Sequence, residues 1–435
     1  MPFESTQGAF FVLHFILYKG IIFRGSNKPK GEKTPKMNDK KKLTLFFTVM
    51  VAFNMAASFA HPVTPTLIVE RGLDSSMFGV ALAAMMMVNF LFSPFWGKLC
   101  GYIPTKRIMM FCGIGYAIGQ IIFGSAQSEV QVVAGRMFAG IFTGGVFTAF
   151  SNYVVNTSPD AKVRGQNLTV MVTIQNVAGA CGYFIGGMLG LISVNAAFIA
   201  QVIVLSTCGV IFYFVCVDDT PFKHKPEKPL SIREANPFSA FAAARTFMTP
   251  MLALIFLIIA VSAIGQNSFE QCFNYYIKDQ FHLSSAYNGI FKAIIAVVSL
   301  ICNSTICLWL VRKTDTNKTF LPIMLLSTAT LFIVIPFRSL MAFVIADVVF
   351  FTFNAIRLPL MQNLTANRAT PETSNQVMGF YQSMNSLGGI FGALFAGLIY
   401  DANVMLPFFL AFGTFAVASC ISLAYVNRYK KEKSN

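Results

Sequence analysis

The stretch AGRMFAGIFTGGVFTAFSNYVVNTSPDAKVRGQNLTVMVTIQNVAGACGYFIGGMLG, residues 134–190, decides the fold. Two apolar segments flank a short polar elbow at 157–165, and the first segment contains Arg136. A charged side chain inside an apolar membrane segment costs roughly 2.5 to 3.5 kcal/mol, so Arg136 should face a protein interior or a watery cavity rather than lipid. Glycines at spacings of four give flat helix faces on which another helix can pack closely. We therefore expect two membrane helices of a transporter, with flat faces made by Gly140, Gly144, Gly182, Gly186 and Gly190.

The same construction returns in the second half of the chain. The apolar segment 347–363 begins with Asp347, the polar elbow 367–372 follows, and the next apolar segment carries Gly388 and Gly392. Repeated pairs of membrane segments are typical of transporters with two halves of like construction. We therefore expect two pseudo-symmetric bundles, and we expect the glycine faces to let these bundles slide.

Composition indicates a polytopic membrane protein. Hydrophobic residues make up 55% of the chain, charged residues only 12%, and the mean hydropathy is +0.62. A membrane-spanning helix needs about 20 apolar residues. The chain contains twelve such spans, which predicts an all-α membrane protein with twelve transmembrane helices. The expected spans are 43–68, 77–97, 107–126, 131–156, 166–190, 193–217, 249–277, 288–311, 319–337, 340–363, 375–399 and 405–427.

Polar segments divide this pattern into domains. The segment between the sixth and seventh spans is rich in proline and lysine and too charged to cross a membrane. Met37, followed closely by three lysines, is an alternative start of translation, and an interfacial helix is the rival interpretation of the residues before it. We expect an N-terminal extension at 1–36, a six-helix bundle at 37–217, a cytoplasmic linker at 218–247, a second six-helix bundle at 248–427 and a basic cytoplasmic tail at 428–435.

The net charge of +15 reflects membrane topology. Basic residues lie in alternate loops and near the chain ends, as the positive-inside rule requires when both termini are cytoplasmic. This distribution excludes a nucleic-acid-binding surface and predicts a multi-pass protein of the plasma membrane. The nine cysteines never form a Cys-x-x-Cys pair, so we expect packing residues and no metal site. The basic residues of these loops include Lys98, Lys106, Arg107, Lys162, Arg164, Arg312 and Lys313.

The loop between the second and third spans resembles a signature of the major facilitator superfamily, G-x-L-(a)-D-x-x-G-(R/K)-(R/K). Gly97 and the basic pair Lys106 and Arg107 match it, whereas Cys100 and Gly101 stand near the place of its acid. In the family, that acid pairs with charges at the domain interface and steadies one conformation. The Arg-x-x-x-Gly-x-x-x-Gly element that starts at Arg136 also belongs to the family's pattern. The resemblance implies two six-helix bundles that rock around a central cavity.

Three further segments are similar to NorA-type multidrug efflux transporters of Gram-positive bacteria. They are 268–270, 353–357 and 383–392. The fifth span also resembles the family's antiporter signature, although Tyr183 stands where that signature has proline. The resemblance implies export of amphipathic, cationic small molecules in exchange for protons.

The seventh span gives this exchange a chemical basis. Gln266, Glu270 and Asn274 recur at intervals of four and therefore share one helix face. In the tenth span, Asp347 lies seven residues before Asn354 and therefore close to the same face of that helix. A carboxyl group in a partly dehydrated cavity can hold or release a proton near neutral pH. If a proton and a cationic substrate compete for it, proton entry can drive substrate exit. The alternative for Arg136 and the two acids is a set of fixed ion pairs between helices.

The working hypothesis is a proton-driven secondary exporter that acts as a monomer in the lipid bilayer, binds a small-molecule substrate and needs no cofactor. A carrier of one metabolite, such as a sugar, opine or lipid precursor, and a non-transporting receptor-like protein are the alternatives; no nucleophile motif or metal-ligand spacing indicates an enzyme. The candidate proton and substrate residues are Glu270, Asp347, Arg136, Gln266, Asn274, Asn354, Arg357, His61 and Asn54, and those for packing and gating are Gly97, Lys106, Arg107, Gly140, Gly144, Gly182, Gly186, Gly190, Gly388 and Gly392.

Overall fold

A computed structural model describes residues 37–74, 77–222, 236–282, 285–335, 339–400 and 402–434. The expected extension at 1–36 and the middle of the expected linker lie outside these residues. Within the described residues all regular structure is helical, and eleven helices are long and apolar enough to cross a membrane. The predicted all-α membrane class is therefore confirmed.

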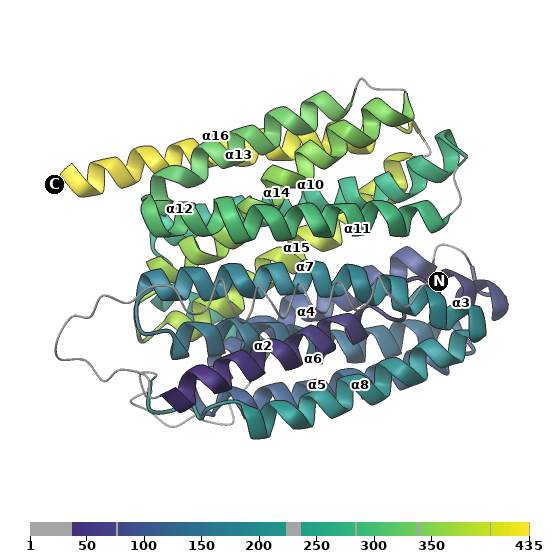
Figure 1. The fold of residues 1–435 in the computed structure, drawn as a ribbon, viewed down its shortest axis with the longest axis horizontal. Coiled ribbons are helices and arrows are strands. Elements are labelled where there is room, and N and C mark those ends of the chain that lie inside the picture. The colour runs from purple at the N-terminus through teal and green to yellow at the C-terminus, as the bar shows by residue number, and fades with distance from the viewer. Residues whose placement is uncertain are drawn as a thin grey trace.

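In Figure 1 the helices form two groups, one above the other, and most helix axes run close to the long axis of the molecule. Two short helical elements, α9 (Pro237–Ala242) and η3 (Ala243–Thr246), lie between the groups in the chain. The first group contains α2 (Met37–Ala57), α3 (Thr64–Glu70), α4 (Met77–Tyr102), α5 (Thr105–Gly124), α6 (Glu129–Thr157), α7 (Ala161–Ile192) and α8 (Val194–Val215). The second contains α10 (Pro250–Gln280), α11 (Ser285–Cys302), the π-helical turn η4 (Asn303–Cys307), α12 (Leu308–Lys313), α13 (Thr316–Val334), α14 (Leu340–Arg368), α15 (Ser374–Tyr400) and α16 (Leu406–Ser434).

The first expected span, 43–68, is not one continuous helix. Helix α2 ends at Ala57, a turn occupies 58–63, and α3 begins at Thr64. Pro62 lies in this turn and Pro65 in the first turn of α3. Proline lacks the backbone donor that a helix interior needs, so the two prolines end one helix and start the next. The structure thus replaces the expected bend with a break.

Side-chain caps fix where several helices begin. Asp160, in the polar elbow after α6, accepts a hydrogen bond from the backbone N–H of Val163 at 2.8 Å and starts α7. Asp315 starts α13 in the same way. Burial raises the pKa of Asp315, but hydrogen bonds from Asn317 and Tyr429 outweigh burial, so the pKa lies below its ordinary value. Asp315 is therefore ionised at neutral pH, the state that caps a helix N-terminus best.

The glycine faces pack helices within each group. A Cβ added at Gly182 of α7 would meet the backbone of α2, and one added at Gly186 would meet the backbone of the turn after α2 at Phe59. A Cβ added at Gly388 or Gly392 would meet the backbone of α10 at 2.5 Å. We expected these faces to let the two bundles slide against each other, but in the structure they pack helices within one bundle. The remaining faces join α7 to the turn before α3 through Gly190 and α6 to α4 through Gly140 and Gly144.

The two groups meet most closely along α4 and α15. A Cβ added at Gly97 would lie 2.8 Å from the Cα of Gly379, so only glycine fits on either helix there. This contact lies at the end of the molecule that carries Lys98, Arg107 and the C-terminal end of α16, which we call the basic end. Close packing at the basic end holds the two groups together there.

A hydrogen-bonded cluster reinforces the same end. Asp219, fully buried after α8, accepts hydrogen bonds from the Thr105 N–H at 2.9 Å and from Asn156 Nδ2 at 2.7 Å. Asn156 also donates to Asn375 Oδ1 of α15 at 3.1 Å, and Asn152 donates to the Asn375 carbonyl at 3.2 Å. We call Thr105, Asn152, Asn156, Asp219 and Asn375 the basic-end latch. The latch links helices α5 and α6 of the first group to α15 of the second.

Candidate functional site

A guanidinium group organises the polar interior of the second group. Arg357 of α14 is 1% exposed, and its Nε and Nη2 donate to Asn354 Oδ1 at 3.0 and 2.8 Å. Its Nη1 donates to Ser262 Oγ at 2.9 Å, and Nη2 also donates to Gln266 Oε1 at 2.7 Å. Charge-assisted hydrogen bonds to a rigid planar fork fix both position and orientation. Arg357 therefore ties α14 to α10.

Glu270 continues this network towards an exposed surface. Gln266 Nε2 donates to Glu270 Oε1 at 2.9 Å, one helical turn along α10. Glu270 is exposed, whereas Arg357 and Asn354 are buried, so a continuous polar path runs from an accessible carboxylate to a buried guanidinium. The expected shared face of Gln266 and Glu270 is present. Asn274 lies on α10, but its side chain is outside the described part of the structure.

Asp347 is the second acid of this region. Its side chain is 1% exposed in α14, and among the described residues its Oδ1 has no hydrogen-bond partner. The charge of Glu270 acts on both Asp347 and Arg357. When Asp347 is ionised, this buried oxygen has no donor among the described residues to compensate its lost hydration. The geometry thus provides one accessible and one enclosed carboxyl group within electrostatic range of each other.

Arg136 lies in the first group and is 5% exposed. Its guanidinium carbon is 3.8 Å from the ring centroid of Phe123, and its Nη2 donates to Thr64 Oγ1 at 3.3 Å. Its Nη1 lies 3.8 Å from the sulfur of Met85. Among the described residues these contacts hold Arg136 through an aromatic face and neutral atoms, so the alternative of a fixed carboxylate pair is not the arrangement present.

Lys292 is a functional candidate outside the residues predicted from the sequence. It lies on α11 inside the expected span 288–311, and its Nζ is 4.3 Å from the ring centroid of Tyr183 on α7. The charge of Glu270 acts on it as well. A lysine within an apolar span obeys the same argument as Arg136, and that signal could have found it. The contact with Tyr183 places Lys292 between the two groups.

The polar residues of the first span have more local roles. Asn54 is 4% exposed, and its Nδ2 donates to the Met50 carbonyl of its own helix at 2.8 Å. His61 lies in the turn at 58–63 with an exposed side chain, and the charges of Arg136 and Lys292 act on it. The structure thus places His61 near the two interior cations and ties Asn54 to its helix.

The basic pair of the signature loop lies away from the latch contacts. Lys106 Nζ is 5.5 Å from the ring centroid of Tyr213, and Arg107 is exposed beside a groove on the outer face of the first group. The carboxylate of Asp219 connects the start of α5 to Asn156 of α6, which in turn donates to Asn375 of α15. The described residues contain no group of three or more His, Cys, Asp or Glu that could hold a metal ion.

Comparison with known proteins agrees with this architecture. The family model of the Major Facilitator Superfamily matches residues 45–356 and 318–435. Multidrug resistance protein 1 of Bacillus subtilis (strain 168) is 21% identical over 89% of this chain and 97% of its own length. The quinolone resistance protein NorA of Staphylococcus aureus (strain MSSA476) is 23% identical over 86% and 94%, and the class C tetracycline resistance protein of Escherichia coli is 25% identical over 79% and 85%.

A solved structure extends the agreement to the fold. The crystal structure of the human organic anion transporter MFSD10 (TETRAN) superposes with a TM-score of 0.76 at 16% identity. The match covers 89% of this chain and 100% of that chain. The predicted arrangement of two six-helix bundles is therefore confirmed at the level of the fold.

Proposed function

Because this chain belongs to the major facilitator superfamily and is a multi-pass membrane transporter, we propose that it exports amphipathic, cationic small molecules in exchange for protons. The observation that carries this proposal is the path from Glu270 through Gln266 to Arg357, together with Asp347, which is buried on the same helix as Arg357. The similarity to proteins named for multidrug, quinolone and tetracycline resistance supports export of drug-like small molecules.

In this mechanism Glu270 and Asp347 are the carboxyl groups for which protons and substrate compete. Glu270 is accessible, so it binds a cation or a proton directly, while Asp347 shares its electrostatic environment. Protonation of the pair weakens its attraction for a cation and promotes release. Deprotonation on the other side restores the attraction. The proton gradient drives the cycle, and no cofactor takes part.

The basic end faces the cytoplasm in this proposal, with both termini cytoplasmic and the protein in the plasma membrane. The units that rock as a monomer around the central site are the bundles at 37–217 and 248–427, joined by the linker at 218–247. The close contact of Gly97 with Gly379 supports a state that is closed towards the cytoplasm. Export then requires this end to open and admit substrate.

The interior charges refine the substrate class. The charge of Glu270 acts on both Arg357 and Lys292, so a substrate with one anionic and one cationic group also finds partners there. Lys292 favours such a zwitterionic substrate as the second candidate, because it is within electrostatic range of Glu270 and contacts the other bundle through Tyr183. A zwitterionic amphiphile would engage the carboxylate and Lys292 together.

The test is uptake of ethidium, a lipophilic cation, into everted vesicles that contain the protein and have an acidic lumen. We expect accumulation that an uncoupler abolishes. Glu270→Gln should remove the proton dependence, since an amide does not titrate. Glu129→Gln, an exposed acid at the start of α6, is the matched control and should leave transport unchanged.

Two results would contradict the proposal. One is the absence of ethidium and quinolone flux with a well-folded protein, which would favour a carrier of a single metabolite. The other is full proton dependence in the Glu270→Gln variant, which would remove Glu270 from the coupling mechanism.

A further inference from the structure

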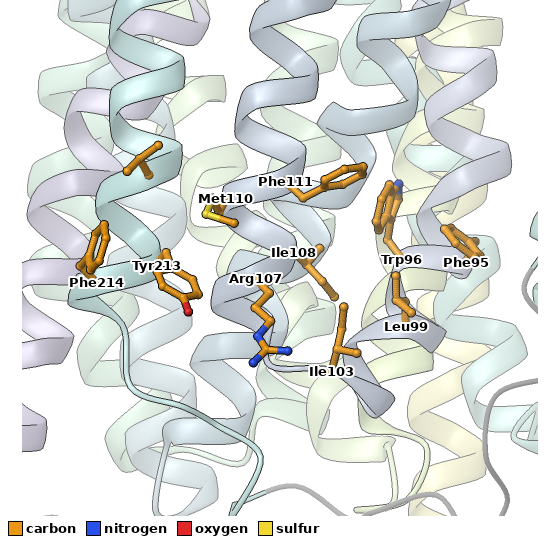
Figure 2. Close-up of a pocket in the computed structure, with 11 residues that line it drawn as sticks. Phe95, Trp96, Leu99, Ile103, Arg107, Ile108, Met110, Phe111, Tyr213 and Phe214 are labelled. Carbon is orange, nitrogen blue, oxygen red and sulfur yellow. The ribbon is translucent and has the colours of Figure 1, made fainter.

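A groove with a volume of about 680 Å³ opens on the first bundle at the basic end. It runs along α5 between the ends of α4 and α8 (Figure 2). We call it the α5 groove. Figure 2 shows Arg107 at one end of the groove, with Met110 and Phe111 above it on α5 and aromatic rings on either side.

The α5 groove faces the lipid rather than the second bundle. Helices α5 and α8 lie on the side of the first bundle that is remote from α13 and α16 (Figure 1). Phe111 and Phe214, which line the groove, are 59% and 74% exposed on helices that are apolar enough to cross a membrane. Exposed apolar side chains at this position contact acyl chains in a bilayer. The natural occupant of the part of the groove away from Arg107 is therefore a hydrocarbon chain.

The end of the groove has a different chemistry. Arg107 is exposed at this end and is the charged residue among those that line the groove. The neighbouring Lys106 lies against the Tyr213 ring. Basic side chains at the end of a membrane helix lie at the level of the lipid headgroups and attract anionic ones. The lining contains no carboxylate that would attract a cationic drug. Charge thus selects an anionic headgroup over a cationic amphiphile.

We propose that the α5 groove binds an anionic phospholipid, with its phosphate at Arg107 and an acyl chain along Phe111, Trp96 and Phe214. This inference does not rest on the proposed transport function, because it concerns the outer surface of one bundle. It also gives Arg107 a role, since this residue of the signature loop takes no part in the basic-end latch.

The two tryptophans of the chain allow a direct test. Trp96 lines the groove, with its Nε1 donating to the Ile141 carbonyl at 2.7 Å. Trp309 is 58% exposed on α12 of the second bundle, also near the basic end, and reports bulk lipid. Brominated acyl chains quench tryptophan fluorescence on contact. The Trp309→Phe variant therefore reads the groove, and the Trp96→Phe variant reads the ordinary lipid surface.

The experiment compares brominated phosphatidylglycerol with brominated phosphatidylcholine in liposomes. We expect the anionic lipid to be favoured about fivefold at Trp96 and much less at Trp309, since a basic residue near a membrane surface contributes roughly 1 kcal/mol. Arg107→Gln should remove the preference at Trp96, and Arg107→Lys should keep most of it. Lys313→Gln, which removes an exposed cation one turn from Trp309, is the matched control and should leave the preference at Trp96 intact.

The outcomes separate the occupants of the groove. Equal quenching of Trp96 by both lipids would overturn the proposal, and so would a preference that persists in Arg107→Gln. Displacement of brominated lipid by ethidium, without a headgroup preference, would assign the groove to drug-like cations instead. Selective quenching that depends on the charge at position 107 would establish the anionic lipid site.

Discussion

Arg357 shows how much of the site depends on one side chain. Four hydrogen bonds from its guanidinium reach Asn354, Ser262 and Gln266, and the last of these connects to Glu270. The bonds come from all three nitrogens of a planar group, so the geometry is specific to arginine. We therefore expect Arg357 to act by positioning Gln266, and through it Glu270, rather than by exchanging protons itself.

The first prediction concerns this positioning. Arg357→Lys keeps the charge but cannot form the forked set of bonds, so at least one buried polar partner loses its donor. Each such loss costs about 1 to 3 kcal/mol. We expect ethidium transport to fall about tenfold or more. A shift in the pH profile of the residual transport distinguishes loss of Glu270 positioning from simple destabilisation, and an unchanged rate would contradict the positioning role.

The second prediction concerns Lys292. If Lys292 binds the anionic group of a zwitterionic substrate, Lys292→Gln should reduce transport of a zwitterionic quinolone about fivefold or more and leave ethidium transport equal or higher. Competition between the two compounds in vesicles measures both effects. Lys313→Gln, outside the interior region, is the control, and an equal loss for both compounds would indicate a structural role for Lys292.

Some of these residues could be predicted from sequence and others could not. The shared face of Gln266 and Glu270 follows from helical periodicity alone, and Arg136 follows from the cost of a charge in an apolar segment. The partnership of Arg357 with Ser262 joins residues 95 positions apart, and a single sequence carries no signal for such a pairing. Lys292 had a signal of the same kind as Arg136.

At the scale of elements, the glycine faces determine how closely helices approach. Gly186 of α7 faces the backbone carbonyl of Phe59, whereas the space around the next residue, Gly187, is open. These adjacent glycines therefore differ in function. Gly186 allows close packing, whereas a Cβ at Gly187 would disturb no contact. Spacing alone identified the packed glycines here, but it could not identify their partner helix.

The third prediction uses this pair. Gly186→Ala should force α7 away from the turn after α2 and cost about 1 to 3 kcal/mol through overpacking. Gly187→Ala should be neutral or stabilising by about 0.5 to 1 kcal/mol, because alanine favours a helix more than glycine does. The midpoint of thermal unfolding in detergent measures both changes. Similar midpoints for the two variants would show that the contact between α7 and the turn after α2 tolerates a methyl group.

Other elements depart from the sequence-based expectation for identifiable reasons. The membrane spans could be predicted from the apolar segments, because the thickness of the hydrocarbon core constrains the length of each segment. The break at 58–63 could not be predicted, because it depends on whether a neighbouring helix satisfies the backbone groups that the prolines leave without hydrogen bonds. A single sequence does not give this information. The π-helical turn at 303–307 has no comparable local signal in the residues that form it.

At the scale of the whole molecule, the basic-end latch joins the two bundles at one end. The latch carboxylate comes from Asp219, beyond the last helix of the first bundle, although the family's signature has its acid in the loop before α5. The two positions are far apart in the chain, and no local motif identifies Asp219 as an acid that contacts the start of α5.

The last prediction tests whether this carboxylate controls opening. Asp219→Asn removes the charge that holds the Thr105 N–H and Asn156, so the closed basic end should lose about 1 to 3 kcal/mol. A loss of 1.4 kcal/mol corresponds to about a tenfold change in the ratio of closed to open molecules. The open population should therefore rise from a minor to a readily measured one.

Spin labels at positions 162 and 370, exposed in the two polar elbows, report the separation of the bundles at this end. A Cys420→Ser background avoids labelling the exposed native cysteine. We expect a short distance in the unmodified latch and an additional longer distance in Asp219→Asn. Asp218→Asn is the matched control, since Asp218 is exposed and adjacent but accepts its hydrogen bond from Thr220 of its own loop. If both variants keep the short distance alone, the closed state depends on the packing of Gly97 against Gly379 rather than on Asp219, and Gly97→Ala should then open the basic end.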